Sequence, residues 1–425
     1  MGCCEDEGKL SLVLDYELEM LSQSTRRVNT GITAESLYLA LAMWMEMFQE
    51  HTVEQFDSLR SRETTADSGK MKDLYRKVGC VLVQENGRLL AVDHSRDDVH
   101  GLAGLLVKLH DRVKGCSAFV SRKPCPYCAK LLVQAGITAV SYPPVEPEYR
   151  HTTKEDERVQ VLFDAGSITQ SVYFPQVKTD LLMSDQELQA KGILLNDIRE
   201  FRRLVSERFW NEESLKRITG SSNEQTYNDF QNLAKWFAQV YLPLKYSKLK
   251  LSAHSEGTGV RFTEETTRAF DPEHNFHEEQ IAKHMLGLAM MTIQRTVEPK
   301  TGVGCAIMKN NDVMAVGWNG FPSEVIEEDF HNLSDQERDK KYPLFVHAEQ
   351  NALLMRNTTD VTGGVIFVTK IPCHECTPLL KVAGIETVVL AMPLKAIKES
   401  YRLNYDIFQE EVKKGSFLCY EMVTV

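Results

Sequence analysis

The sequence predicts an α/β fold of two tandem three-layer α/β/α units joined by a helical segment. An internal repeat indicates the two units: 123-KPCPYCAKLLVQAGI-137 returns as 371-IPCHECTPLLKVAGI-385, and 78-VGCVLV-83 returns as 303-VGCAIM-308. Within each copy, apolar runs of strand length alternate with amphipathic runs of helical length. This alternation is typical of a sheet that is covered by helices on both faces.

Each copy is expected to begin with a helix and a β-hairpin. The two amphipathic helical patterns lie at residues 34–48 and 278–296. Two apolar strands separated by a polar turn follow in each copy, and we match 78–83 and 88–93 of the first copy with 303–308 and 313–318 of the second. After the hairpin come a histidine that precedes a helical pattern, a further strand and a CxxC pair.

Residues between about 145 and 262 show no repeat. Apolar residues recur there at helical spacing in 194–205 and 230–241, so we expect packing helices rather than a flexible linker. The segment 252–259 is the best candidate for a flexible join, and 417–425 reads as a closing strand.

Composition predicts a globular protein and weighs against nucleic-acid and membrane partners. The chain has 425 residues, of which 43% are hydrophobic, and a formal net charge of −11. Proteins that bind nucleic-acid backbones usually carry a basic surface, because displaced counterions supply much of the affinity. No run of about 18 apolar residues occurs. We expect a cytoplasmic protein, with the nucleus as an alternative location.

The second copy carries the residues of a metal centre. In a reducing compartment a CxxC pair indicates metal or redox chemistry. Cys373 and Cys376 stand at the start of a helical pattern, and His347 starts another. Three protein ligands leave a fourth position open for water, which is the arrangement of catalytic zinc. Glu349, two residues after His347, is placed to take a proton from that water.

The second copy resembles the zinc-dependent cytidine and deoxycytidylate deaminases over residues 278–412. The resemblance rests on His-x-Glu followed by Pro-Cys-x-x-Cys, and on the stretches 295-RTVEPKTGVGCAI-307, 317-GWNGFP-322 and 342-YPLFVHAEQNAL-353. It implies a cytidine-deaminase-like fold, zinc on His347, Cys373 and Cys376, and Glu349 as proton shuttle. The implied reaction is attack of water on cytosine C4 with loss of ammonia, leaving uracil.

The two-copy layout resembles a vertebrate branch of that family. This implies free deoxycytidine nucleotides as substrates, dCTP above all, and a homo-oligomer, either a trimer or a hexamer. Asn319 would contact the sugar and phosphate side of the nucleotide, although it is alternatively a turn residue at a strand end. Ala348 belongs to the expected substrate contacts, and four cations near the motif form a plausible anion pocket: Arg295, Lys300, Lys370 and Arg402.

The first copy keeps the ligands but lacks the acid. His100, Cys125 and Cys128 match the second-copy ligands, while Leu102 stands at the position of Glu349. Because leucine moves no proton, we expect a second zinc without deamination. His94 and His110 are rival ligands, and the alternative is a metal-free pair of core cysteines.

These patterns predict four segments. They are an N-terminal extension (1–30), a degenerate deaminase-like domain (31–145), a helical connecting region (146–262) and a catalytic deaminase domain (263–425). The expected reaction is deamination of dCTP to dUTP and ammonia. The alternatives are a dCMP deaminase, a tRNA or single-stranded DNA deaminase, and a zinc-stabilised binding protein. Ile371 argues against the tRNA deaminases, which usually have Glu before Pro-Cys.

Overall fold

The computed structural model describes residues 31–47, 77–96, 99–145, 147, 153–220, 224–252, 270–296, 302–322, 344–394 and 404–424. The described residues form two compact units. The N-terminal unit comprises Ile32–Thr179 and Arg199–Phe237, and the C-terminal unit comprises Asp180–Ile198 and the described part of Ala238–Val425. The predicted extension 1–30 and nearly all of the predicted join at 252–259 lie outside the described residues.

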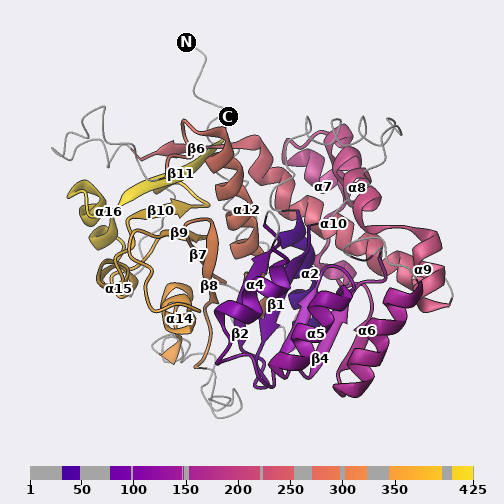
Figure 1. The fold of residues 1–425 in the computed structure, drawn as a ribbon. Coiled ribbons are helices and arrows are strands. Elements are labelled where there is room, and N and C mark those ends of the chain that lie inside the picture. The colour runs from indigo at the N-terminus through magenta and orange to yellow at the C-terminus, as the bar shows by residue number, and fades with distance from the viewer. Residues whose placement is uncertain are drawn as a thin grey trace, which may run out of the picture. The chain divides into compact units, whose positions relative to one another are not determined.

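The N-terminal unit is built on a five-stranded sheet with the strand order β2-β1-β3-β4-β5 (Figure 1). β1 pairs antiparallel with β2 and β3, and the pairs β3–β4 and β4–β5 are parallel. The strands are β1 (Gly79–Val83), β2 (Leu89–His94), β3 (Ser117–Val120), β4 (Ala139–Tyr142) and β5 (Thr169–Val172). The sheet therefore continues past residue 145, because β5 pairs with β4.

Helices cover this sheet in two layers. α2 packs on β1, β2 and β3, while α4 packs on β1, β2 and α5, and α5 packs on α6. Their bounds are α2 (Ala34–Glu46), α4 (Gly101–Lys108), α5 (Pro126–Ala135) and α6 (Thr153–Ala165). α2 is buried from Ser36 to Glu46, and its first turn is capped by Thr33, whose hydroxyl accepts a hydrogen bond from the Ser36 N–H at 3.2 Å.

The C-terminal unit repeats this plan and adds one strand. Its sheet has the order β6-β11-β10-β9-β7-β8. Without β6, that order matches the five strands of the N-terminal unit one by one. The strands are β6 (Ser247–Leu251), β7 (Gly304–Lys309), β8 (Asp312–Trp318), β9 (Val365–Val368), β10 (Thr387–Leu390) and β11 (Leu418–Thr424). β11 is the predicted closing strand, and β6, from the predicted connecting region, pairs antiparallel with it.

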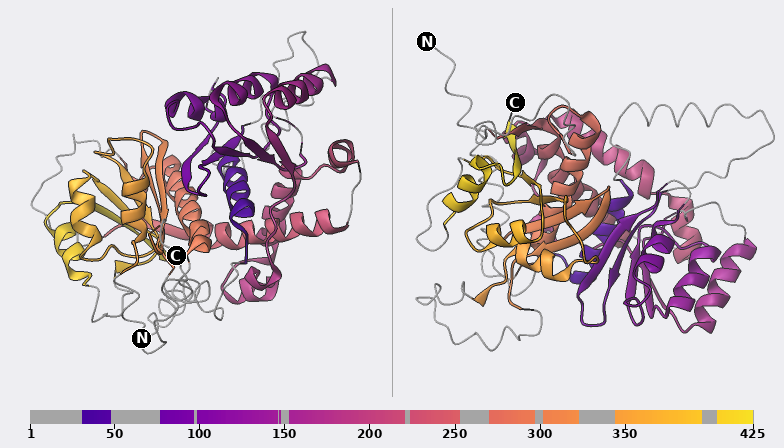
Figure 2. Two further views of the ribbon diagram at one scale, coloured as in Figure 1. Left: turned by 90° about the horizontal axis from the view of Figure 1, so that it is seen from below. Right: turned by 60° about the vertical axis from the view of Figure 1, so that its left-hand side comes forward.

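The three layers of the C-terminal unit are visible in both views of Figure 2. α12 lies on one face of the sheet, and α14, α15 and α16 lie on the other. The bounds are α12 (Phe276–Thr292), followed by the 3₁₀ turn η2 (Ile293–Arg295), α14 (Ala348–Met355), α15 (Cys376–Val382) and α16 (Asp406–Lys413). The core between sheet and helices is apolar and includes Ile307, Ile366, Val388, Leu380 and Phe408. The predicted fold class is thereby confirmed.

The remaining helices lie in the connecting region. They are η1 (Thr179–Leu181), α7 (Asp185–Ala190), α8 (Leu195–Phe209), α9 (Glu212–Thr219) and α10 (Glu224–Tyr246). The helices predicted over 194–205 and 230–241 are thus present as α8 and α10. No helix within the described parts of the chain is long and apolar enough to cross a membrane. The predicted domain boundaries themselves stay predictions.

The matching hairpins differ by one residue from the predicted alignment. In the N-terminal unit Leu82 faces Ala91, and in the C-terminal unit Ile307 faces Ala315. The register shifts at the next residue in both hairpins. Leu89–His94 therefore matches Val313–Trp318, and Ser95 occupies the position of Asn319.

Candidate active site

His347 begins α14 as its N-cap residue and is held in place by the helix. Its backbone N–H donates to the side-chain oxygen of Gln350 at 2.9 Å. α14 lies directly against β8, because a Cβ atom at Gly317 would stand only 2.3 Å from the Ala348 carbonyl oxygen. Glycine at 317 therefore permits the close approach that brings the start of α14 to the end of the sheet.

The two cysteines of the CxxC pair converge on His347. The His347 Nδ1 atom is 3.2 Å from the Cys373 sulfur and 3.3 Å from the Cys376 sulfur. Both cysteines are buried. α15 begins at Cys376, so Cys373 precedes the helix and reaches the site from the turn before it, where its carbonyl accepts the Thr377 N–H at 2.9 Å.

The geometry of this group fits zinc. In a tetrahedral site with Zn–S of about 2.3 Å and Zn–N of about 2.0 Å, ligand atoms lie roughly 3.5 Å apart. The observed N–S distances of 3.2 and 3.3 Å are close to this value. Hydrogen bonds with Cys376 and His347 lower the pKa of Cys373 to about 4. The hydrogen bond with Cys373, followed by burial, raises the pKa of the Cys376 thiol. One thiolate is thus already favoured, as metal ligation requires.

Glu349 lies beside the metal-binding group and is only 4% exposed. Burial, with a further contribution from the negative charge of Cys373, raises the pKa of Glu349 to about 7. A carboxyl group with this pKa can both take and return a proton near neutral pH. The Cys305 side chain of β7 is also buried. Its burial, followed by the negative charge of Glu349, raises the pKa of its thiol.

Asn319 is brought to the metal centre by two backbone links. Gly320 and Val346 form an isolated bridge, so the turn that holds Asn319 pairs with the residue before His347. The Asn319 N–H donates to the Val303 carbonyl at 3.1 Å, and the Asn319 side-chain oxygen accepts from the Val303 N–H at 2.7 Å. The oxygen therefore has a structural partner, and the side-chain NH₂ is the group that can donate to a ligand.

Two of the four expected phosphate ligands are described. Arg295 lies in η2, with its guanidinium 5.6 Å from the ring centre of Trp318, the residue before Asn319. Lys370 follows β9 and is half-buried, two residues past the β9 end. Since β7 is antiparallel to both β8 and β9, the ends of those strands meet at the same edge of the sheet. Lys300 and Arg402 lie outside the described residues.

Sequence reasoning missed two residues beside this site. Glu375 places a carboxylate oxygen 3.8 Å from His347 Nε2, on the side of the ring away from the cysteines. Tyr405 precedes α16, and burial followed by the charges of Cys373, Glu349 and Cys376 raises its pKa to about 12. The adjoining Asn404 N–H donates to His374 Nδ1 at 3.1 Å, which ties this segment to the CxxC turn. Glu375 lies within the repeated CxxC stretch but replaces Tyr127 of the first copy, and Tyr405 lies outside the quoted repeat stretches.

The N-terminal unit has a second convergent group. His100 Nδ1 lies 3.5 Å from the Cys125 sulfur and 3.3 Å from the Cys128 sulfur. Of the described residues, only these three and the C-terminal group of His347, Cys373 and Cys376 form His/Cys/Asp/Glu clusters able to hold a metal. The rival ligands His94 and His110 are therefore not part of the cluster.

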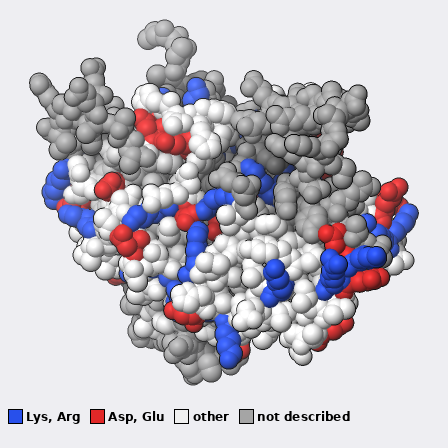
Figure 3. All heavy atoms as spheres, viewed as in Figure 1, with Lys and Arg blue, Asp and Glu red and all other residues white. Residues whose placement is uncertain are grey.

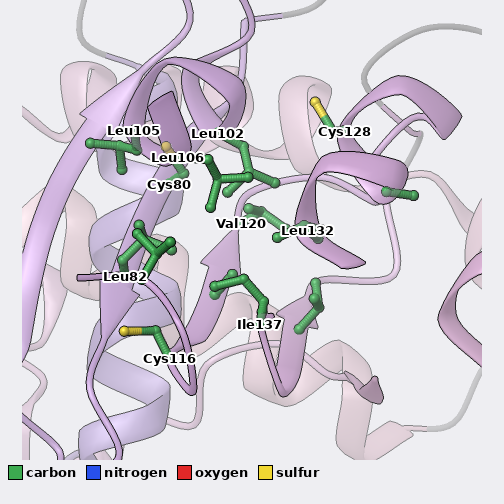
Figure 4. Close-up of a cluster of buried hydrophobic side chains, with 14 of the residues drawn as sticks. Cys80, Leu82, Leu102, Leu105, Leu106, Cys116, Val120, Cys128, Leu132 and Ile137 are labelled. Carbon is green, nitrogen blue, oxygen red and sulfur yellow. The ribbon is translucent and has the colours of Figure 1, made fainter. Parts of the chain in front are cut away.

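Leu102 is a core residue in the N-terminal unit. It is 3% exposed and packs in an apolar cluster with Cys80, Leu106 and Cys128. Figure 4 shows Leu102 among Leu105, Leu106 and Cys80. In the N-terminal unit, the position that corresponds to Glu349 is thus occupied by a side chain of the hydrophobic core.

Comparison with known proteins identifies a family of relatives. The family described as "Cytidine and deoxycytidylate deaminase zinc-binding region" matches residues 57–143 and 279–392. The zebrafish "Cytidine and dCMP deaminase domain-containing protein 1" is 24% identical over 410 residues, covering 84% of this chain and 83% of the relative. The solved apo structure of the dCMP deaminase from cyanophage S-TIM5 aligns with 33% of this chain and 96% of its own at 25% identity, with a TM-score of 0.26.

Two deoxycytidylate deaminases match about a quarter of the chain. Deoxycytidylate deaminase of Mycobacterium phage D29 is 31% identical over 116 residues, covering 25% of this chain and 91% of the phage protein. Human deoxycytidylate deaminase is 33% identical over 110 residues, which is 62% of its length. The fold and the His-Cys-Cys groups define a zinc-type hydrolytic deaminase. The chain belongs to the cytidine and deoxycytidylate deaminase family.

Proposed function

We propose that the C-terminal unit deaminates free deoxycytidine nucleotides, with dCTP as the preferred substrate and dUTP and ammonia as products. The observation that carries this proposal is the buried carboxyl group of Glu349, two residues from His347, whose Nδ1 lies within 3.3 Å of two cysteine sulfurs. A structural metal site has no use for a buried acid at this position, whereas a hydrolytic centre requires one.

Zinc held by His347, Cys373 and Cys376 would supply a water that is acidic enough to act as nucleophile near neutral pH. Glu349 takes one proton from this water and delivers it to ring N3, and it then transfers the second proton of the same water to the leaving amino group. The C4–O bond forms, the C4–N bond breaks, and ammonia leaves. Burial of Glu349 keeps bulk water away from its carboxyl group and holds its pKa near 7, which suits both steps.

Asn319, Ala348 and Tyr405 are the proposed positioning groups. The Asn319 side-chain NH₂ is oriented by the bond from Val303 to its oxygen. The methyl group of Ala348 is fully buried, so its backbone is what it can offer to a pyrimidine ring. Tyr405 is half-buried and lies within electrostatic range of Glu349 and both cysteines.

The cations near the site bear on the choice between dCTP and dCMP, because the two nucleotides differ in the number of phosphate groups. Arg295 and Lys370 are close to the same sheet edge as Asn319, while the other two proposed phosphate ligands, Lys300 and Arg402, lie outside the described residues. Two described cations on the side of Asn319 support a substrate that carries several phosphate charges, and we therefore propose a triphosphate. dCMP is the alternative, and it is supported by the names of the human and phage relatives.

A polynucleotide substrate is less well supported. The chain carries a formal net charge of −11, and Ile371 before the CxxC pair is a buried core residue. We further propose that the N-terminal unit holds zinc without deaminating, because Leu102 replaces the acid. Assembly into a trimer or hexamer stays a prediction.

The test is incubation of purified zinc-loaded protein with dCTP, dCMP, cytidine, tRNA and single-stranded DNA, with ammonia and uracil products measured. We expect turnover of the free deoxynucleotides with the highest kcat/KM for dCTP. Turnover of polynucleotide alone would contradict the proposal. The absence of turnover on every substrate would favour a binding protein.

A further inference from the structure

A surface groove lies between α5 and α6 of the N-terminal unit, with a cavity volume of about 780 Å³. This volume is within the range of about 300–1,000 Å³ that is usual for small-molecule sites. The groove is formed entirely within one unit. None of the residues that line it belongs to the C-terminal unit, and its apolar lining includes Val161, which is 66% exposed.

The charge of the groove is opposite to that of the whole chain. Lys130 of α5 and Lys154 and Arg158 of α6 line it, against the single carboxylate of Glu157. Lys154 and Arg158 are four residues apart on α6, so their side chains project from the same helical face. The neighbouring acid Asp156 is paired with Lys123 at 3.1 Å. A groove with three cations and one anion, in a chain of net charge −11, is suited to an anion.

An exposed aromatic ring lies beside these cations. Tyr127 of α5 is 48% exposed. Its ring is oriented by an edge contact with the His100 ring at 5.3 Å and by the Lys130 ammonium at 5.1 Å from the ring centre. Alignment of the two copies shows that only the N-terminal unit has an aromatic ring at this position. The equivalent positions of Tyr127 and Lys130 in the second CxxC stretch are Glu375 and Pro378.

We propose that this groove binds a nucleoside triphosphate, with the base stacked on Tyr127 and the phosphates bound by Lys154 and Arg158. Base stacking on an aromatic side chain needs an exposed ring face, and the triphosphate needs clustered cations. Lys130, whose ammonium lies 5.1 Å from the Tyr127 ring centre, adds a third cation, and Glu157 can accept a hydrogen bond from an amino group on the base.

A free nucleotide fits the groove better than a polynucleotide. A single-stranded nucleic acid needs a succession of aromatic platforms along a basic track. Here the lining offers one ring and one cluster of cations. Figure 3 shows Lys and Arg side chains over α5 and α6 with uncharged surface between them, interspersed with acidic side chains rather than continued as a basic stripe.

The experiment measures binding of labelled ATP to the zinc-loaded full-length protein by equilibrium dialysis. We expect the double variant Lys154→Glu/Arg158→Glu to bind ATP on the order of ten-fold or more weakly. Tyr127→Leu should lose affinity by a similar factor, since stacking contributes on that order, and Tyr127→Phe should restore it. The matched control is Lys114→Glu/Lys178→Glu, which reverses two exposed cations of the same unit outside the groove.

Inorganic triphosphate and a short single-stranded oligonucleotide complete the test. Inorganic triphosphate should bind more weakly than ATP and should be indifferent to Tyr127→Leu. Equal binding of ATP by the control and by both groove variants would overturn the proposal. Inorganic triphosphate that binds as tightly as ATP would reduce the groove to a charged patch. An oligonucleotide that binds there more tightly than ATP would replace it with a nucleic-acid surface. Zinc content and melting temperature verify that each variant is folded.

Discussion

The Asn319 side-chain oxygen accepts a hydrogen bond from the Val303 N–H at 2.7 Å, and the Ser95 hydroxyl accepts the matching bond from the Val78 N–H at 3.1 Å. The backbone N–H groups of both residues also donate to the partner carbonyl, at 3.1 and 2.8 Å. Serine therefore fulfils the structural role of this position. What asparagine adds is an NH₂ donor at the edge of the C-terminal site.

Asn319→Ser is expected to preserve the fold and reduce activity. The Ser95 geometry shows that a hydroxyl can close this strand end, so the melting temperature should change little. Loss of the amide donor should lower kcat/KM by roughly 10- to 100-fold, the value of one hydrogen bond to a charged or polar substrate group. Steady-state kinetics and thermal denaturation check this. Unchanged kinetics would leave Asn319 as a turn residue only.

The two metal sites are expected to differ in their effect on catalysis. Cys373→Ser and Cys125→Ser are matched substitutions of the first cysteine in each pair. Each should reduce the zinc content from two to one per chain, because each removes one of three ligands. Only Cys373→Ser should abolish deamination. Metal analysis with an activity assay measures both, and wild-type protein with one zinc would contradict the N-terminal site.

Leu102→Glu is expected to destabilise the protein without creating a second active site. Leu102 is 3% exposed among apolar side chains, so a carboxyl group there loses hydration without gaining a partner, at a cost of several kcal/mol. Leu102→Met is the matched control and should cost less than about 1.5 kcal/mol. Urea denaturation compares the two variants. Deamination by the double variant Leu102→Glu/Glu349→Gln would contradict the prediction that the N-terminal unit gains no active site.

His94 is expected to make the N-terminal unit sensitive to acid. Burial, followed by the charges of Arg96, Lys77 and Lys108, lowers the pKa of His94 to about 3. Since the unfolded value is 6.5, the unfolded chain binds the proton between these pH values and the folded chain does not. Stability is therefore full above pH 6.5 and falls towards pH 3, with a loss of about 2 kcal/mol by pH 5.

Urea denaturation at pH 8 and pH 5 tests this pH dependence. His94→Gln should flatten it, and His110→Gln, at an exposed position, should leave it as in the wild type. If both variants keep the same pH dependence, other groups cause it.

The metal ligands and most elements were predictable because their signals are local. CxxC, His-x-Glu and the apolar strand runs are short patterns, and the repeat supplied a second occurrence of the histidine, the CxxC pair and the strand runs. β5 escaped notice because its residues Thr169–Val172 alternate between exposed and half-buried positions, as at a polar sheet edge. β6 reads Ser-Lys-Leu-Lys-Leu and shows its pairing only through β11, which is far away in sequence.

The side chains that complete the site could not be predicted, because the contacts that position them also join segments that are far apart in the sequence. Tyr405 reaches the centre from the segment before α16, through the link between Asn404 and His374. The hairpin alignment was displaced by one residue because five residues separate Val83 from its partner Leu89, whereas four separate Met308 from Val313. With that shift, Ser95 rather than a neighbouring residue matches Asn319. Local patterns thus indicated the chemistry, while the tertiary structure determined its surroundings.

The most direct test of the central claim is Glu349→Gln, which keeps the shape of the side chain and removes its ability to take a proton. The measurement pairs zinc content with ammonia release from dCTP and dCMP. The account predicts unchanged zinc and a rate lower by at least about 10²- to 10⁴-fold, the usual contribution of a general acid–base group. Wild-type turnover in Glu349→Gln would contradict the assignment of Glu349 as the proton shuttle.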